Sequence, residues 1–322
     1  MFETRLRVRP GVAREVMASS TVIGPASAGK TCFLVTLDQA LHRLHDVQAR
    51  AAAGDGAAKA MLQRRELPDA AVHIEARNQG MKAVQLLRES VLAKGWSAGG
   101  LHLVEATSEV ARIEFALVTG GRSGRRYDFS ILDGPGGSIF PQLGRTQERE
   151  TDHYFRHRRE LREALEGTTG LMVCLDGSDA SAAAEIAKGL RGLATELAER
   201  GRAPVERAIV CLTKADKRYY QTGRNARGCA ERGDAWDLAT KLLTADGVDA
   251  LRSIVSGPVC ARWISSYGFL PDGSANYDPH TGGFLADDLG PADTARFWEP
   301  YGVLEAFLFL ADGKPRGATL LR

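Results

Sequence analysis

Residues 24–31, with the sequence GPASAGKT, constrain the fold of this chain more than any other segment. They match the pattern G-x-x-x-x-G-K-[ST] at every fixed position. The β-branched run TVI of residues 21–23 precedes them, and a segment with helical periodicity follows. A strand, a glycine-rich loop and a helix in this order turn backbone N–H groups and a helix dipole toward a polyphosphate. The segment therefore predicts a phosphate-binding loop in an α/β fold.

Each residue type in this loop has an expected task. Lys30 would reach the β- and γ-phosphates, which makes it a candidate catalytic residue, and the Thr31 hydroxyl would ligate Mg²⁺. The alternative is a chance glycine turn before a helix. The residues predicted to contact the nucleotide here are Gly24, Ser27, Ala28, Gly29, Lys30, Thr31 and Cys32.

Length and composition favour one ordinary globular domain. The chain has 322 residues, of which 44% are hydrophobic and 25% charged, and its net charge of +2 argues against nucleic-acid binding. Since one nucleotide signature is complete, we expect an N-terminal extension at 1–20 and a single domain at 21–322. A helical insertion is expected at about 45–100 and a long loop at about 269–295.

The N-terminus and the cysteines indicate the expected location. The basic N-terminal segment lacks the apolar core of a secretory signal, and no apolar run is long enough for a membrane span. The five cysteines form no C-x-x-C pair, so we expect free, mostly buried thiols. A cytoplasmic protein is therefore predicted.

The first half of the chain combines helices with a hairpin. Leucines at 34, 37, 41 and 44 predict a helix from the phosphate loop to about 54–56, and two further helices are expected at 57–65 and 73–94. Apolar and polar residues alternate over 111–119, and apolar residues are frequent in 126–133. The glycine-rich segment 120–124 between them is typical of a turn. This pattern predicts two antiparallel strands.

The second half alternates buried strands with helices. Continuous apolar runs at 170–176, 208–212 and 259–264 predict parallel strands, the last of them ending the sheet. Helices are expected at 182–200 and 302–311. Ligand sites in such sheets lie at the carboxyl ends of the strands.

A second motif, DGPG at 133–136, ends the strand 126–133. The Asp133 carboxylate would hold the Mg²⁺ shell, and the Gly136 amide would approach the γ-phosphate because no Cβ stands in the way. D-x-x-G alone is also common in turns. Its place after the phosphate loop and at a strand end favours the site.

A third motif, TKAD at 213–216, follows the strand 208–212. Asp216 would accept hydrogen bonds from guanine N1–H and the 2-amino group, and the Lys214 stem would lie along the base beside Thr213. Adenine lacks this pair of donors, so the motif favours GTP over ATP. After the last predicted strand, Ser265 and Ser266 would offer backbone N–H groups to guanine O6, although an ordinary turn is an equal alternative.

These motifs and their order resemble the Ras-like and translation-factor class of P-loop GTPases, in particular bacterial small Ras-like and double-GTPase-type proteins. The resemblance implies a P-loop three-layer sandwich whose mostly parallel six-stranded sheet has the order 2-3-1-4-5-6 and one antiparallel strand. It also implies a switch threonine that ligates Mg²⁺ and contacts the γ-phosphate. Thr107, shortly before the strand 111–119, has the matching position.

The chain departs from the family pattern at Gly137, where many Ras-like enzymes carry a glutamine that orients the attacking water. Gln142, one of the arginines 145, 149 and 156, or a group from a partner protein could replace it. We therefore expect slow hydrolysis alone and stimulation by a partner.

The sequence as a whole predicts a GTP-binding switch that hydrolyses GTP to GDP with Mg²⁺ and presents segments 96–110 and 134–149 to a protein effector. Two alternatives stay open. One is a guanine-nucleotide-sensing module without turnover, and the other is an ATP-using P-loop enzyme.

Overall fold

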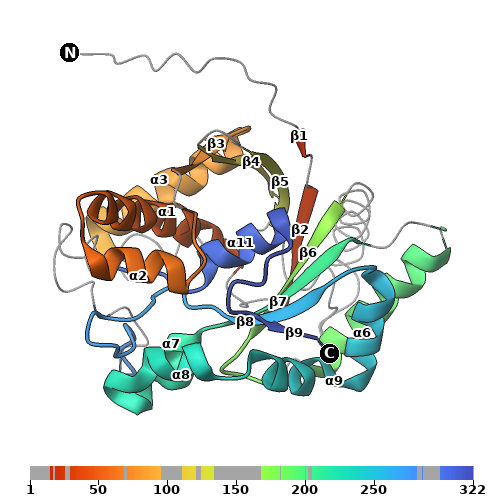
Figure 1. Cartoon of the computed structure of the whole chain (residues 1–322). Helices are drawn as coiled ribbons and strands as arrows, with labels where there is room; N and C mark the ends of the chain where they lie inside the picture. The colour runs from red at the N-terminus through yellow and green to blue at the C-terminus, as the bar shows by residue number, and fades with distance from the viewer. Residues whose placement is uncertain are drawn as a thin grey trace.

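The computed structural model of the chain describes residues 15–16, 19–25, 30–68, 71–95, 111–120, 125–133, 168–181, 183–199, 201, 205–280, 285 and 298–321. These residues form an α/β structure with two hydrogen-bonded sheets of five and four strands (Figure 1). The predicted α/β class is confirmed. The predicted single sheet of six strands is wrong, because three further strands, β1, β3 and β9, lie at sheet edges and β2 forms no ladder with its neighbour β5.

The larger sheet is mostly parallel and has the order β2-β6-β7-β8-β9. Its parallel strands are β2 (Ser19–Ile23), β6 (Thr168–Asp176), β7 (Arg207–Thr213) and β8 (Val259–Trp263). Successive residues of a strand point to opposite faces. Leu171 and Val173 accordingly enter one hydrophobic core, while Met172 and Cys174 enter the other. The predicted buried strands are confirmed.

The larger sheet ends one strand later than predicted. β9 (Thr319–Leu320) pairs antiparallel with β8, so β8 is not the last strand. A two-residue strand is too short to show any periodicity in the sequence, and only its pairing with β8 defines it.

The smaller sheet has the order β1-β5-β4-β3 and contains the predicted hairpin. β4 (Ala111–Thr119) and β5 (Arg126–Asp133) pair antiparallel, and Ile113, Phe115 and Leu117 are buried. β1 (Glu15–Val16) pairs parallel with β5, and β2 already begins at Ser19. The end of the predicted extension 1–20 therefore belongs to the sheets.

The predicted helix at 73–94 is wrong over its first residues. β3 (Val72–Ala76) pairs antiparallel with β4, and α3 (Gln79–Gly95) begins only after it. Asn78 marks this change, because its Oδ1 accepts the Met81 N–H as a helix cap and the Glu114 N–H of β4. The predicted helical insertion therefore contains an edge strand.

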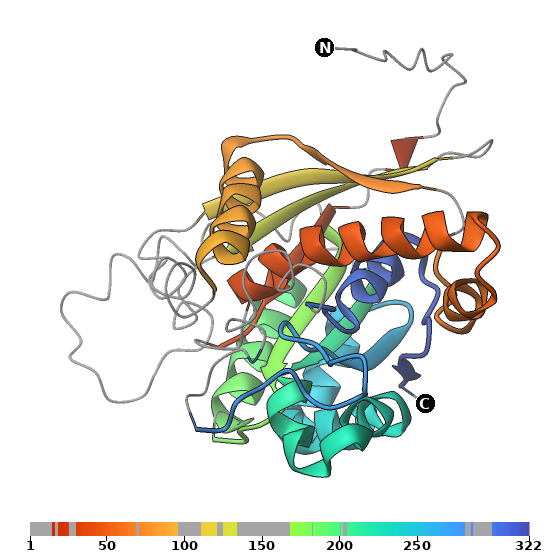
Figure 2. The same cartoon turned by 90° about the vertical axis from the view of Figure 1, so that its left-hand side faces the viewer.

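Helices cover both faces of the larger sheet (Figure 2). One core contains α1 (Lys30–Ala52), α2 (Gly56–Arg64) and α11 (Val303–Asp312); the other contains α6 (Ala183–Glu199) and α9 (Ala235–Ile254). Between β7 and α9, three short helices had no sequence-based assignment: α7 (Ala215–Tyr219), η3 (Tyr220–Asn225) and α8 (Ala226–Arg232). In the part of the chain that is described, no helix combines the length and apolarity needed to cross a membrane.

α11 carries a buried charge into the core. Glu305 is completely buried, and its Oε1 lies 2.7 Å from Arg65 Nε and 3.2 Å from an Arg262 guanidinium nitrogen. Burial by itself would raise the pKa of Glu305, but the two arginines outweigh it and lower that pKa to about 2. The carboxylate is therefore ionised in the folded protein and links α11 to the end of α2 and to β8.

We predict that Glu305→Gln lowers the free energy of unfolding by about 3–5 kcal/mol, because it leaves two arginines facing an uncharged buried group. Urea unfolding at neutral pH measures the change. The wild-type contribution of Glu305 is complete above its unfolded pKa near 4.5 and is lost as the pH falls toward 2.

Glu206→Gln is the matched control, because Glu206 also pairs with an arginine but is 58% exposed. Its loss should stay below about 1 kcal/mol. Equal losses for the two variants would contradict the role assigned to the buried pair.

Candidate functional site

The candidate site lies at one edge of the larger sheet. β2, β6, β7 and β8 are parallel neighbours, so their carboxyl ends meet at the same edge. β5 is parallel to β1 and lies beside β2, which brings its carboxyl end to that edge as well. The segments that carry the sequence motifs follow these strand ends.

The phosphate loop begins where the chain leaving β2 passes close to β6. A Cβ on Gly24 would lie 2.4 Å from the carbonyl oxygen of Cys174 in β6, so only glycine allows this approach. Lys30 is the first residue of α1, and its Nζ donates to the carbonyl oxygens of Gly24 and Pro25, each at 3.0 Å. The predicted strand and helix thus flank the loop, and the ammonium is held at its start.

Several predicted site residues lie outside the described part of the chain. These are Ser27, Ala28 and Gly29 of the phosphate loop, the switch residue Thr107, Gly136 and Gln142, and segments 96–110 and 134–149. Thr31 belongs to α1 and Asp133 ends β5, but their side chains also lie outside it. Cys32 is half-buried against the core. No cluster of three or more metal-ligating His, Cys, Asp or Glu residues occurs within the described ranges.

The TKAD segment joins the ends of β6 and β7. Thr213 Oγ1 donates to the Leu175 carbonyl at 3.0 Å. Lys214 adopts the left-handed conformation, with φ of 60°, and its Nζ lies 2.5 Å from Asp176 Oδ2. Asp216 lies in the first turn of α7 and is buried, with 4% of its surface exposed. Of these residues, Asp176 was not predicted as a site residue.

Asp216 and Ser265 form a buried pair across β7 and β8. Ser265 Oγ donates to Asp216 Oδ1 and accepts the Gly268 N–H at 2.7 Å. Burial raises the pKa of Asp216 to about 6, although the Ser265 bond, backbone N–H groups and the Lys214 charge act in the opposite direction. The structure therefore brings the predicted base-binding residues Asp216 and Ser265 together.

The Ser265–Ser266 loop is braced by residues that sequence reasoning missed. Ser265 exchanges both backbone hydrogen bonds with Tyr301, at 3.0 and 2.9 Å, so its N–H is already used and is not available to guanine O6 as predicted. Trp298 Nε1 donates to the Ser266 carbonyl at 2.7 Å, and the Asn276 N–H donates to the Gly268 carbonyl at 3.1 Å. A tryptophan in the polar segment before α11 was the one available signal, since a buried indole N–H needs an acceptor.

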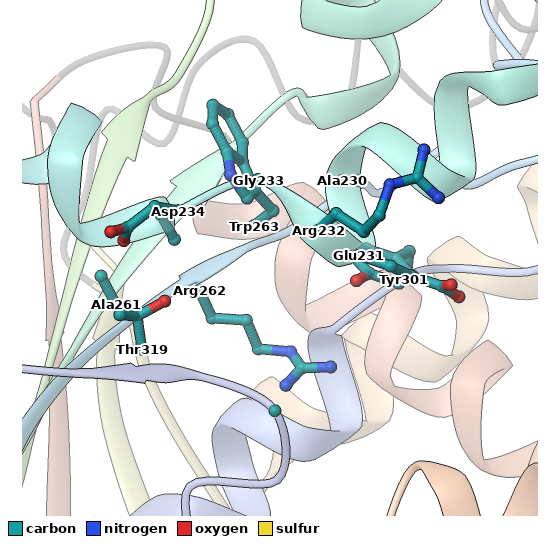
Figure 3. Close-up of a pocket in the computed structure, with 12 residues that line it drawn as sticks. Ala230, Glu231, Arg232, Gly233, Asp234, Ala261, Arg262, Trp263, Tyr301 and Thr319 are labelled. Atoms are coloured by element: carbon teal, nitrogen blue, oxygen red, sulfur yellow. The ribbon is translucent and has the colours of Figure 1, made fainter.

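A separate cavity of about 280 Å³ lies between the α8–α9 junction and the strands β8 and β9 (Figure 3). None of the predicted site residues lines it. On one side the Arg262 guanidinium carbon lies 5.8 Å from the centre of the Tyr301 ring. The cavity is therefore distinct from the candidate site at the carboxyl ends of the strands (the strand-end site).

Comparisons with known proteins add nothing to this geometry. No protein-family model matches the chain, and no curated protein matches its sequence.

We predict that Ser265→Ala raises the pKa of Asp216 above its wild-type value of about 6, because the ionised carboxylate loses a hydrogen-bond donor. Carboxyl ¹³C NMR titration of the nucleotide-free protein measures this pKa. Ser266→Ala is the control and should leave it unchanged. An unchanged Asp216 titration in Ser265→Ala would contradict the pairing.

Proposed function

We propose that this protein is a guanine-nucleotide-binding switch that hydrolyses GTP to GDP with Mg²⁺, slowly alone and faster with a protein partner. One observation carries the proposal: a lysine suited to phosphates and a buried carboxylate suited to guanine follow parallel strands of one sheet. Lys30 comes after β2, and Asp216 comes after β7. A nucleotide spanning this edge would meet both.

The strand order supports a Ras-like P-loop architecture. With β1, β3 and β9 set aside, and with β2 beside β5, the strands follow the order β4-β5-β2-β6-β7-β8. This is the order 2-3-1-4-5-6 that the motif resemblance implies. Helices on both faces of the larger sheet agree with a three-layer sandwich.

Base recognition follows from the chemistry of Asp216. Guanine presents two donors, N1–H and the 2-amino group, on one edge, and an ionised carboxylate has two oxygens to accept them. Because Asp216 is buried, a base without these donors would leave its charge poorly compensated. Ser265 already holds one oxygen, which orients the carboxylate before the base arrives.

The phosphate end would work by positioning and charge. The Lys30 ammonium, now bonded to two loop carbonyls, would exchange onto the phosphate oxygens. Thr31 in the first turn of α1 and Asp133 at the end of β5 would supply two oxygen ligands of Mg²⁺. The ion would neutralise phosphate charge when bound.

A second candidate function is nucleotide sensing without turnover, and Gly137 favours it. This residue has no side chain to orient an attacking water. A partner that supplies an arginine can raise the hydrolysis rate by roughly 10³–10⁵. A protein without a water-orienting side chain and without such a partner would bind GTP and signal by its conformation alone.

We predict that the wild type binds a fluorescent GDP analogue and that unlabelled ATP does not displace it. Asp216→Asn should weaken GDP binding by roughly 10²–10⁴-fold, since two charge-assisted hydrogen bonds are lost. The variant should instead prefer xanthosine diphosphate, whose C2 carbonyl can accept from the asparagine amide.

Asp272→Asn provides the control for these titrations, because Asp272 is an exposed carboxylate outside the site. It should bind GDP as the wild type does. Efficient displacement by ATP, or an Asp216→Asn protein that still prefers GDP, would overturn the guanine assignment and favour the ATP-using alternative.

We predict slow phosphate release from γ-labelled GTP under single-turnover conditions, with acceleration by cell lysate and loss in Lys30→Met. Quantifying labelled phosphate over time gives the rate. Tight GTP binding without phosphate release in either condition would rule out the hydrolase and leave the sensing module.

A further inference from the structure

Asp176, the last residue of β6, is a second acidic group at the strand-end site. Its Oδ1 accepts from Ser178, from the backbone N–H at 2.8 Å and from Oγ at 2.6 Å. Its Oδ2 lies 2.5 Å from Lys214 Nζ. Both oxygens are therefore engaged, and the second is committed to a lysine of the proposed base-binding segment.

Lys214 is fixed in place from several directions. Its backbone is left-handed, and its carbonyl accepts the Arg218 N–H of α7 at 2.9 Å. Next to it, the Gly177 N–H donates to the Thr213 carbonyl at 3.0 Å. A Cβ on Gly177 would lie 2.7 Å from the Trp263 ring, so this close turn requires glycine. The Asp176–Lys214 ion pair joins the last residue of β6 to the residue that follows β7.

Stability alone gives little reason for this pair. Asp176 and Lys214 keep 20% and 34% of their side-chain surface exposed, and ion pairs that contact solvent add little to folding free energy. The position of the pair beside Asp216 points instead to a role in the site. Lys214 stands two residues before Asp216, and its charge acts on that carboxyl group.

Two carboxylates thus compete for one ammonium. If Lys214 paired with Asp216, its charge would occupy the acceptor oxygens that guanine needs. With the ammonium on Asp176, the lysine stem lies across the ends of β6 and β7, and Asp216 keeps Ser265 as its close partner. The stem can then form an apolar wall for the base.

We propose that Asp176 is a positioning residue for guanine recognition: it holds the Lys214 ammonium, so that the lysine stem faces the base and the Asp216 carboxylate stays available to it. This inference rests on the proposed guanine-nucleotide function. Asp176 itself does not touch the base.

The test combines Asp176→Ala with Lys214→Met, which keeps the apolar stem and removes the charge. Asp176→Ala should weaken binding of a fluorescent GDP analogue by roughly five- to tenfold. In the Lys214→Met background the same change should have less than about a twofold effect, because no ammonium is left to misplace. Additive effects in this cycle would overturn the proposal.

Asp179→Ala is the matched control. Asp179 accepts from the backbone N–H and Oγ of Ser181 as Asp176 accepts from Ser178, but it makes no hydrogen bond to Lys214. Its GDP affinity should equal that of the wild type. Should Asp176→Ala fail to fold, Asp176→Asn keeps the acceptor for Ser178 and removes the charge.

A second measurement needs no nucleotide. In Asp176→Ala the freed ammonium should approach Asp216 and lower the Asp216 pKa, which carboxyl ¹³C NMR follows. An unmoved Asp216 pKa would overturn the inference. Absence of GDP binding by the wild type, with the pKa lowered in the variant, would instead overturn the proposed function and leave the competition between the carboxylates intact.

Discussion

The core of this protein depends on neutralising one buried carboxylate. α11 is buried from Val303 to Ala311, and Glu305 stands inside that stretch. Because an unpaired buried carboxylate costs several kcal/mol, α11 packs most stably where Arg65 and Arg262 both reach Glu305. The end of α2, the strand β8 and α11 are therefore held in one arrangement.

The same group of charges reaches the strand-end site. Arg65 also lies 3.6 Å from Glu299, which Arg227 of α8 contacts as well. Glu299 forms a backbone bridge with Gly268, at the end of the loop that begins with Ser265. A Cβ on Gly268 would lie 1.8 Å from the Glu299 carbonyl oxygen, so the two segments are in direct contact. The loop proposed to face the base is thus supported by partly buried ion pairs that share Arg65 with the buried Glu305.

Strong periodicity made much of the fold predictable. β6 and β7 are continuous apolar runs, and β4 alternates apolar with polar residues. These patterns are long enough to identify the strands, which form as expected. β3 was missed because the short alternation VHIEA was assigned to the start of the following helix, and β9 because two residues are too few to show a period. In the site, the motifs led to Lys30, Asp216 and Ser265. Asp176 and Trp298 became visible only through contacts between segments distant in the chain.

The burial of Asp216 has a calorimetric consequence. A carboxyl group whose pKa is about 6 is partly protonated in slightly acidic solution, whereas guanine donors require the ionised form. Capture of a guanine base near that pH would therefore expel a proton into the buffer. The heat measured on binding would then include the ionisation enthalpy of the buffer, so two buffers at one pH would report different enthalpies for the same association.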